Sequence, residues 1–375
     1  MEKYMPTVCG KVCRRVTRGQ TNNTHNLSES PCRASCVAPR VHTCIHSLAR
    51  STSGRAMQDV HDERGRELFR TEAAIRATMM HYFRALHDCD GEAFASMFHP
   101  QGRLLGIGPD GAVVCRGYEA FRAQALARGR STEYSVHDNI VSVYTIDDTC
   151  ATVKAQVVLP PDPNSPTPTA ELTLYTDFMT LLWDDSLGGW RIISKVYSSA
   201  PLSASAAAPA RAKTTPADFA EAAAAVWDGY VSAGRACSSA DMARFFHPAC
   251  NLTFATPSEP LGTGGLAIIS SDDFCAHVGT RWSSAKHARY AHLQDDPRAS
   301  AQDCLLSLDF AGPGVARATL LIGYPPFLYH DVLLLLRLSA PVHGRAGWWI
   351  VAKSSSSTPL LADEAAPVPQ SRRLG

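Results

Sequence analysis

The sequence predicts an α+β protein that carries one unit of about 130 residues twice in tandem. The run Leu-Tyr-Thr-Asp-Phe-Met-Thr-Leu-Leu at 174–182, with Trp-Arg-Ile-Ile-Ser-Lys at 190–195, returns as Leu-Tyr-His-Asp-Val-Leu-Leu-Leu-Leu at 328–336 and Trp-Trp-Ile-Val-Ala-Lys at 348–353. Tyr82 precedes His99 by 17 residues, and Tyr230 precedes His247 by the same distance. Insertions fall between these landmarks, so the pattern indicates duplication of a domain and not a solenoid of short repeats.

Residues 1–56 form a basic, acid-poor segment without helix or strand periodicity, and we interpret them as a disordered leader. Its composition also fits a mitochondrial presequence, or translation that truly begins at Met57. A third reading is metal binding, but its Cys and His lack the paired Cys-x2-Cys spacing of structural zinc sites. We therefore predict no metal site and no cofactor.

The first unit is expected at 66–199. Apolar residues at helical spacing predict a helix from Arg66 that ends before Asp90-Gly91, and a short second helix ends before Pro100. Turn residues then separate strands at 103–107 and 112–115 from a helix at 118–128. Four longer strands are expected at 136–146, 149–159, 170–183 and 190–197, with a Pro-rich loop at 160–168.

A linker rich in Ala, Ser and Pro is expected at 200–216, and the second unit at 217–357. The order of elements then begins again, and a loose tail follows at 358–375. Helices are predicted at 219–231, 241–246 and 272–280, and strands at 304–310, 316–324, 328–339 and 348–354.

The first unit resembles the nuclear transport factor 2-like superfamily, and within it the group called putative lumazine-binding. The resemblance rests on Tyr-Phe-Arg-Ala-Leu-His-x-x-Asp-Gly-x-x-Phe, Phe-His-Pro-x-x-Arg-Leu and Gly-Trp-Arg-Ile-Ile-Ser-Lys-Val-Tyr, in that order across 71–199. The second unit is divergent, with Ser238, Met242 and Trp349 in place of Asp90, Phe94 and Arg191.

This resemblance implies two cone-shaped domains, each a curved antiparallel sheet wrapped round about three helices with a pocket in the cone. Such proteins include isomerases, dehydratases, cyclases and epoxide hydrolases, and also many non-enzymes, so the fold does not give the function.

Asp177 and Lys195 stand about equally far from the turn between their strands, which places them opposite or nearly opposite on one face. Asp331 and Lys353 repeat this arrangement. One hypothesis makes Asp177 a general base in an apolar pocket, as the resembling isomerases use a carboxylate. The other makes both pairs structural ion pairs, because a neighbouring ammonium depresses a carboxylate pKa and weakens it as a base.

Polar residues at positions that could reach the interior of the cone are the candidate ligand contacts. His99 and the tyrosines also have ordinary roles, as a helix-end imidazole and as half-buried packing residues with a polar end. Arg103 could hold an anionic ligand or lie at the surface. The pocket candidates are Tyr82, His99, His137, Tyr175, Asp177, Lys195 and Tyr197.

The leading functional hypothesis is non-catalytic binding of a small apolar or aromatic molecule in the first unit. The second unit places Leu333, Leu335 and Trp349 on its strands and is expected to be mainly structural. The alternatives are an enzyme that uses Asp177 and a protein-interaction module. We expect the two units to face each other as an internal pseudo-dimer through the outer faces of their sheets, which leaves the chain monomeric.

The net charge of +1 gives no electrostatic signal for nucleic acid or an anionic membrane, and no apolar run approaches the ~20 residues of a membrane span. Five of the twelve Cys lie in the first 56 residues and the others are scattered singly. Such scatter is typical of a reducing compartment, so a cytoplasmic location is expected unless the leader is a presequence.

Overall fold

The computed structural model describes residues 71–108, 110–161, 172–202, 214–255, 266–283, 288–294 and 296–360. The predicted leader, the start of the first unit (66–70), most of the Pro-rich loop and of the linker, and the tail beyond residue 360 lie outside these residues. All described residues fall within one compact unit, 53–375. We call 71–202 domain 1 and 214–360 domain 2.

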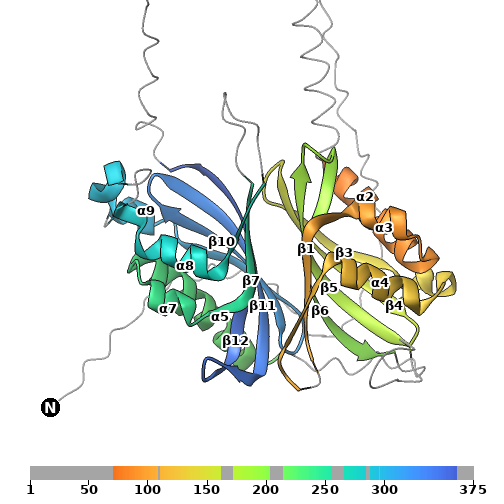
Figure 1. Cartoon of the computed structure of the whole chain (residues 1–375). Helices are drawn as coiled ribbons and strands as arrows, with labels where there is room; N and C mark the ends of the chain where they lie inside the picture. The colour runs from red at the N-terminus through yellow and green to blue at the C-terminus, as the bar shows by residue number, and fades with distance from the viewer. Residues whose placement is uncertain are drawn as a thin grey trace, which may run out of the picture. The chain divides into compact units, whose positions relative to one another are not determined.

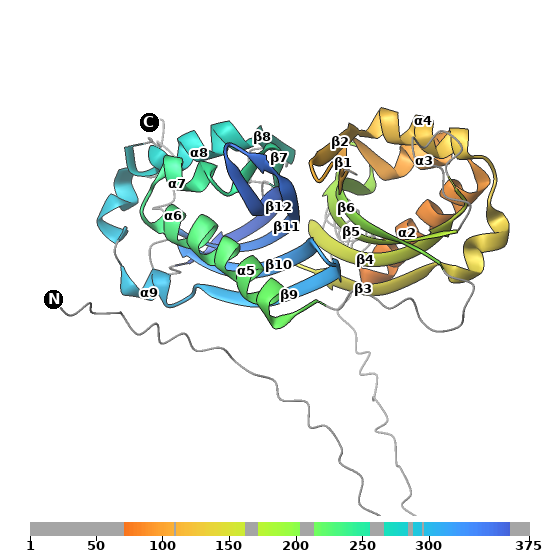
Figure 2. The ribbon, with the colours of Figure 1, turned by 90° about the horizontal axis from the view of Figure 1, so that it is seen from below.

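Domain 1 begins with two helices joined at Asp90. α2 (Glu72–Asp88) starts after Thr71 and ends at Cys89, which adopts a left-handed conformation. α3 (Gly91–Met97) is capped by the Asp90 carboxylate, which accepts from the amides of Glu92 and Ala93. α4 (Tyr118–Arg128) follows the first strand pair and spans the residues expected from the sequence. Figure 2 shows the sheet of domain 1 curving round α2 and α3.

Six strands form the sheet of domain 1, in the order β2-β1-β6-β5-β4-β3 (Figure 1). All neighbours are antiparallel except β1 and β6, which run parallel. A short 3₁₀ helix, η1 (Thr132–His137), occupies the beginning of the strand predicted at 136–146. The strands are β1 (Phe98–Ile107), β2 (Val113–Gly117), β3 (Asn139–Thr145), β4 (Cys150–Leu159), β5 (Thr173–Asp184) and β6 (Gly189–Pro201).

Domain 2 repeats this sheet in the order β8-β7-β12-β11-β10-β9. Its first strand pair, β7 with β8, was missed in the sequence, where only four strands were expected. Phe246-His247-Pro248 reads as the end of a helix but belongs to the strand β7, as Phe98-His99-Pro100 belongs to β1. The strands are β7 (Phe246–Ala255), β8 (Leu266–Ser270), β9 (Cys304–Gly312), β10 (Val315–Tyr324), β11 (Phe327–Val342) and β12 (Arg345–Pro359).

The first helix of domain 2 differs from α2 because it changes form half-way. α5 (Pro216–Val226) passes into a π-helical turn, η2 (Trp227–Ser232), and then into the single turn α6 (Ala233–Arg235). Gly229 sits in the π turn, where an added Cβ would lie 2.0 Å from the Phe245 ring. The remaining helices are α7 (Ser239–Ala243), α8 (Ser271–Gly279), η3 (Arg281–Ser283), η4 (Ala288–Leu293) and α9 (Pro297–Ser300).

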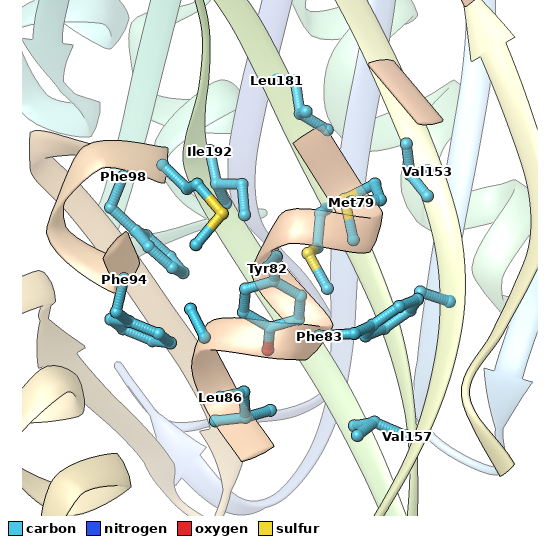
Figure 3. Close-up of a cluster of buried hydrophobic side chains, with 14 of the residues drawn as sticks. Met79, Tyr82, Phe83, Leu86, Phe94, Phe98, Val153, Val157, Leu181 and Ile192 are labelled. Atoms are coloured by element: carbon cyan, nitrogen blue, oxygen red, sulfur yellow. The ribbon is translucent and has the colours of Figure 1, made fainter. Parts of the chain in front are cut away.

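Each domain buries its own apolar core between its helices and the inner face of its sheet. In domain 1 this core surrounds Tyr82 of α2, which lies among Phe83, Phe94 and Phe98 (Figure 3). The ring centroids of these three side chains lie 5.7, 5.9 and 6.0 Å from that of Tyr82. The packing of these aromatic rings therefore fixes the Tyr82 side chain, with its hydroxyl in the interior of the domain.

A third apolar cluster joins the outer faces of the two sheets. It combines Leu105, Phe178 and Val196 of domain 1 with strand residues of domain 2 such as Val332 and Leu334, all at most 1% exposed. Polar contacts cross beside it: Lys154 Nζ lies 2.9 Å from Asp309 Oδ1, and the Tyr144 hydroxyl lies 3.0 Å from His330 Nε2. The two sheets thus bury their outer faces against each other within one chain.

None of the described helices combines the length and the apolar character needed to cross a membrane.

Candidate ligand-binding site in domain 1

Asp177 and Lys195 meet at the centre of the inner face of the sheet. Lys195 Nζ lies 2.5 Å from Asp177 Oδ2 and donates a second hydrogen bond to the Tyr82 hydroxyl at 2.8 Å. Their exposed fractions are 0% for Asp177 and 4% for Lys195. In the β5–β6 ladder Asp177 stands opposite Tyr197, and Lys195 opposite Met179, so the pair is diagonal.

The second carboxylate oxygen of Asp177, Oδ1, is buried and has no hydrogen-bond partner among the described residues. Burial raises the pKa of Asp177, while the charge of Lys195 acts in the opposite direction. Burial alone would lower the pKa of Lys195, but its contacts with Asp177 and Tyr82 hold it above its ordinary value. Burial also raises the pKa of Tyr82 to about 12. Asp177 Oδ1 is therefore an unused hydrogen-bond acceptor close to the ammonium group of Lys195.

A cavity of about 40 Å³ opens beside these groups. Such a volume suits one or two water molecules, whereas sites for larger ligands usually measure ~300 Å³ or more. Two contacts restrict its rim: Arg116 Nη1 donates to Gln124 Oε1 at 3.1 Å, and the Arg128 guanidinium lies 5.9 Å from the centre of the Tyr175 ring. The lining consists of Tyr82, Leu86, Leu104, Arg116, Phe121, Gln124, Arg128, Leu159, Tyr175, Lys195 and Tyr197.

Four of the pocket candidates, Tyr82, Tyr175, Lys195 and Tyr197, line this cavity together, and Asp177 is bonded to Lys195 beside it. The two histidines do not line it. His99 points its Nε2 toward Asp184, 3.7 Å from Oδ2, and His137 is exposed at the end of η1. The sequence analysis put His99 at the end of a helix and His137 on a predicted strand, whereas His99 belongs to β1 and His137 ends η1.

Three polar lining residues were not singled out in the sequence: Arg116, Gln124 and Arg128. A signal for two of them was present, because Gln124 and Arg128 follow the core residue Phe121 at helical steps of three and four. They therefore share its face of α4. Within the described part of the chain, no group of three or more His, Cys, Asp or Glu side chains could hold a metal ion.

The corresponding site of domain 2 is fully bonded. Lys353 Nζ donates to Asp331 Oδ1 at 2.6 Å, the Ser355 hydroxyl donates to the same oxygen, and the Tyr230 hydroxyl donates to Oδ2 at 2.5 Å. Burial lowers the pKa of Lys353, although Asp331 acts against this shift. Both oxygens of Asp331 are thus occupied by the protein itself.

Two local differences explain why one site is satisfied and the other is not. Ser355 stands opposite Asp331 in its ladder, whereas Tyr197 holds the equivalent place opposite Asp177 and lines the cavity. Tyr230 lies in the π turn of domain 2 and its hydroxyl bonds the carboxylate, whereas Tyr82 lies in the regular helix α2 and its hydroxyl bonds Lys195. π turns often occur at functional sites, but here the π turn positions Tyr230 to occupy the carboxylate of Asp331, which leaves no free acceptor in domain 2.

The family described as putative lumazine-binding matches residues 70–198. The match spans nearly all of domain 1. No curated protein matches the chain. Domain 2 repeats the strand order of domain 1 and is a second, divergent copy of the same fold.

Similar solved structures are described as NTF2-like or as having a cystatin-like fold. An NTF-2 like protein of unknown function from Silicibacter pomeroyi is 23% identical, with a TM-score of 0.28, and the match covers 34% of this chain and 94% of that one. One from Shewanella baltica is 18% identical, with a TM-score of 0.28 and coverage of 40% and 99%. An uncharacterized protein with a cystatin-like fold from Caulobacter vibrioides is 18% identical, with a TM-score of 0.26 and coverage of 35% and 89%.

Proposed function

We propose that domain 1 binds a small planar heteroaromatic molecule without transforming it, and that domain 2 is mainly its structural partner. The observation that carries this proposal is the unpaired Oδ1 of Asp177, since a buried acceptor without a donor costs roughly 1–3 kcal/mol or more. A ligand N–H would satisfy it. Asp331 needs no such donor, because Tyr230, Lys353 and Ser355 already occupy both of its oxygens.

The other lining residues fit a flat molecule with carbonyl groups. The rings of Tyr175 and Tyr197 lie 5.8 Å apart and offer aromatic surfaces on the same cavity. Arg116 and Arg128 would donate to ligand carbonyl oxygens at the rim. A lumazine has this combination of a fused aromatic ring, ring N–H and carbonyl groups, and the family description makes it the first probe.

Binding requires the cavity to open, because about 40 Å³ cannot hold a bicyclic ring. The half-buried rim is the part that can move: Arg128 and Tyr175 form one side, and Arg116 and Gln124 form the other. The inner side is fixed by the ion pair of Asp177 and by the aromatic packing round Tyr82. Ligand binding should therefore displace rim side chains and leave the ion pair in place.

Titration with lumazine, followed by ligand fluorescence and calorimetry, tests the proposal. Asp177→Asn replaces the charged carboxylate with a neutral amide. It should weaken binding about tenfold or more, as expected for the loss of a hydrogen bond to a charged group. Asp331→Asn removes the equivalent charge in domain 2 and is the matched control, with affinity unchanged. Equal losses, or a larger loss at Asp331, would refute the assignment.

Because Asp177→Asn also removes an ion pair, a rim variant provides a second test. Arg128→Gln lies outside the core and should lower the affinity for lumazine while the melting temperature stays close to that of the parent chain. If neither lumazine nor related pteridines and flavins bind the parent chain, the proposal fails.

A second candidate is general-base catalysis by Asp177, which the raised pKa of this buried carboxyl and its free oxygen favour. The two candidates differ in what happens to the ligand. Under the binding proposal, mass spectrometry after long incubation recovers the ligand unchanged. A product that disappears with Asp177→Asn but persists with Asp331→Asn would show catalysis instead.

A further inference from the structure

A groove of about 470 Å³ lies between the two domains, away from the Asp177 cavity. Its domain 1 side is formed by β1 and the end of β2, and its domain 2 side by β7 and β8. The lining is Pro100, Gln101, Gly102, Arg103, Gly117, Asn251, Ile268, Ile269 and Ser270. The volume falls in the range of small-molecule sites, which often occur at domain interfaces.

The groove carries one cation that has no acidic partner. Arg103 Nη1 donates to the carbonyl oxygen of Ala249 at 3.3 Å, and no carboxylate of the described residues pairs with this guanidinium. The remaining N–H groups of Arg103 stay available, and they suit the two oxygens of a carboxylate. Among the described lining residues, Arg103 is the single charged side chain.

Gly117 adds a second electropositive element, because it is the N-cap of the 11-residue helix α4 and supplies no side-chain cap. The position where its Cβ would stand has no neighbouring atom within 4 Å, so the start of α4 faces open space. Uncapped N–H groups and the helix dipole favour an anion there, in competition with the carboxylate of Glu119 in the first turn. On the domain 2 side of the groove, the Ser270 side chain caps α8 and donates a hydrogen bond to Asp273. Because the start of α8 is already capped, we place the bound anion on the domain 1 side.

Asn251 supplies a further polar group on the domain 2 side of the groove. The residue is 9% exposed and lines the groove, and its side-chain amide is not among the buried polar groups that lack a partner, so the amide is open to the groove. Its primary amide offers two donors and an acceptor that a ligand can bind in place of water. Asn251 occupies the position of Arg103 in the repeat: each precedes the residue that stands opposite the core lysine of its own sheet.

We propose that this groove binds a small organic carboxylate with an apolar body. The carboxylate lies between Arg103 and the first turn of α4, the amide of Asn251 bonds a polar group or a carboxylate oxygen, and Ile268 and Ile269 contact the apolar part. This site does not depend on ligand binding in domain 1, because the two cavities share no lining residue.

Calorimetric titration of the full chain with benzoate and phenylacetate tests the proposal, with benzamide as the uncharged match for benzoate. We expect saturable binding of at least one carboxylate and at least about tenfold weaker binding of benzamide. Arg103→Gln should weaken carboxylate binding by a similar factor, and Asn251→Asp, which places a negative charge in the groove, should abolish it.

Arg76→Gln is the control, because Arg76 is an exposed arginine of α2 that pairs with Glu72 and lines neither cavity, so its loss should not change carboxylate affinity. Circular dichroism and melting temperature establish that each variant is folded. Arg103→Lys, which keeps the charge and the length, provides a second variant and should retain part of the affinity if Arg103→Gln is unstable. Absence of saturable binding by both carboxylates, or equal binding by benzamide, would overturn the proposal.

Discussion

Lys195 bonds Asp177 across a diagonal of the β5–β6 ladder, although Met179 is the residue directly opposite it. The lysine also reaches the hydroxyl of Tyr82, so a helix and two strands meet at one ammonium group. Because this ammonium is 4% exposed, its charge is balanced chiefly by Asp177. The pair connects the helical layer to the sheet at the deepest point of domain 1.

Lys195→Met should destabilise the chain by about 3–5 kcal/mol, because it leaves a buried carboxylate without its counter-charge. Burial already raises the pKa of Asp177, and loss of Lys195 raises it further. A carboxyl whose pKa is raised in the folded state stabilises the fold at low pH, and this contribution is lost as pH rises. The loss of unfolding free energy in Lys195→Met, relative to the parent chain, should therefore be smaller at about pH 5 than at about pH 8. Urea unfolding at the two pH values measures this.

The double variant Lys195→Met with Asp177→Asn should recover part of the lost stability, because no uncompensated charge then remains. A deficit that does not change with pH, or a double variant no better than Lys195→Met, would contradict a balancing role for the ion pair.

At alkaline pH, the stability of the fold should fall because the buried hydroxyl of Tyr82 resists losing its proton. Burial raises its pKa from 10.0 to about 12, so the stability that it contributes is present below about pH 10 and is lost as pH rises toward 12. Tyr82→Phe removes this titration together with the bond to Lys195, at a cost of about 1 kcal/mol near neutral pH. The difference in unfolding free energy between parent and variant should therefore shrink from about pH 9 to about pH 11. A constant difference would contradict the prediction.

The sequence predicted the α+β class, the tandem repeat and most strands, because these depend on apolar periodicity and on turn residues close in the chain. α4 was predicted at its observed ends, since Gly117 and Gly129 flank its apolar steps. β7 and β8 were missed, because Pro248 resembles a helix stop and β7 has the polar Thr253 where β1 has Leu105.

The candidate site was less predictable, for a different reason. The Asp177–Lys195 contact follows from strand pairing, which turn position indicates. The convergence of Arg116, Gln124 and Arg128 on the same cavity depends on how α4 packs over the sheet. His99 and His137 do not line the cavity: His99 lies near Asp184, and His137 is exposed at the end of η1. Periodicity places a residue on a face of its element, and tertiary packing decides what that face meets.

The π turn of domain 2 should be sensitive to added volume. In Gly229→Ala the new Cβ would lie 2.0 Å from the Phe245 ring, so we expect destabilisation of about 1–3 kcal/mol. Asp228→Ala alters the exposed neighbour in the same turn and should stay within about 0.5 kcal/mol of the parent. Chemical unfolding measures both. A neutral Gly229→Ala would show that the turn relaxes freely and does not fix Tyr230.

In solution the chain should be a monomer, because the outer faces of its sheets already cover each other. Size-exclusion chromatography with light scattering should give a mass near 40.5 kDa. Leu334→Arg places a charge in this contact, where Leu334 is 0% exposed, and should lower the melting temperature or expose apolar surface to a fluorescent dye. A stable species of twice the mass in the parent chain would refute the prediction.

Arg103 and Asn251 occupy matched places on the two sides of one groove, yet one is a cation and the other a neutral amide. Two separate copies of one polypeptide, related by a two-fold axis, must present the same residue on both sides, so a cation there would face its own like charge. Covalent fusion removes that obligation, since each half can mutate alone. The two sides of the groove can therefore differ in charge, so that a bound molecule has one orientation, with its anionic group toward Arg103.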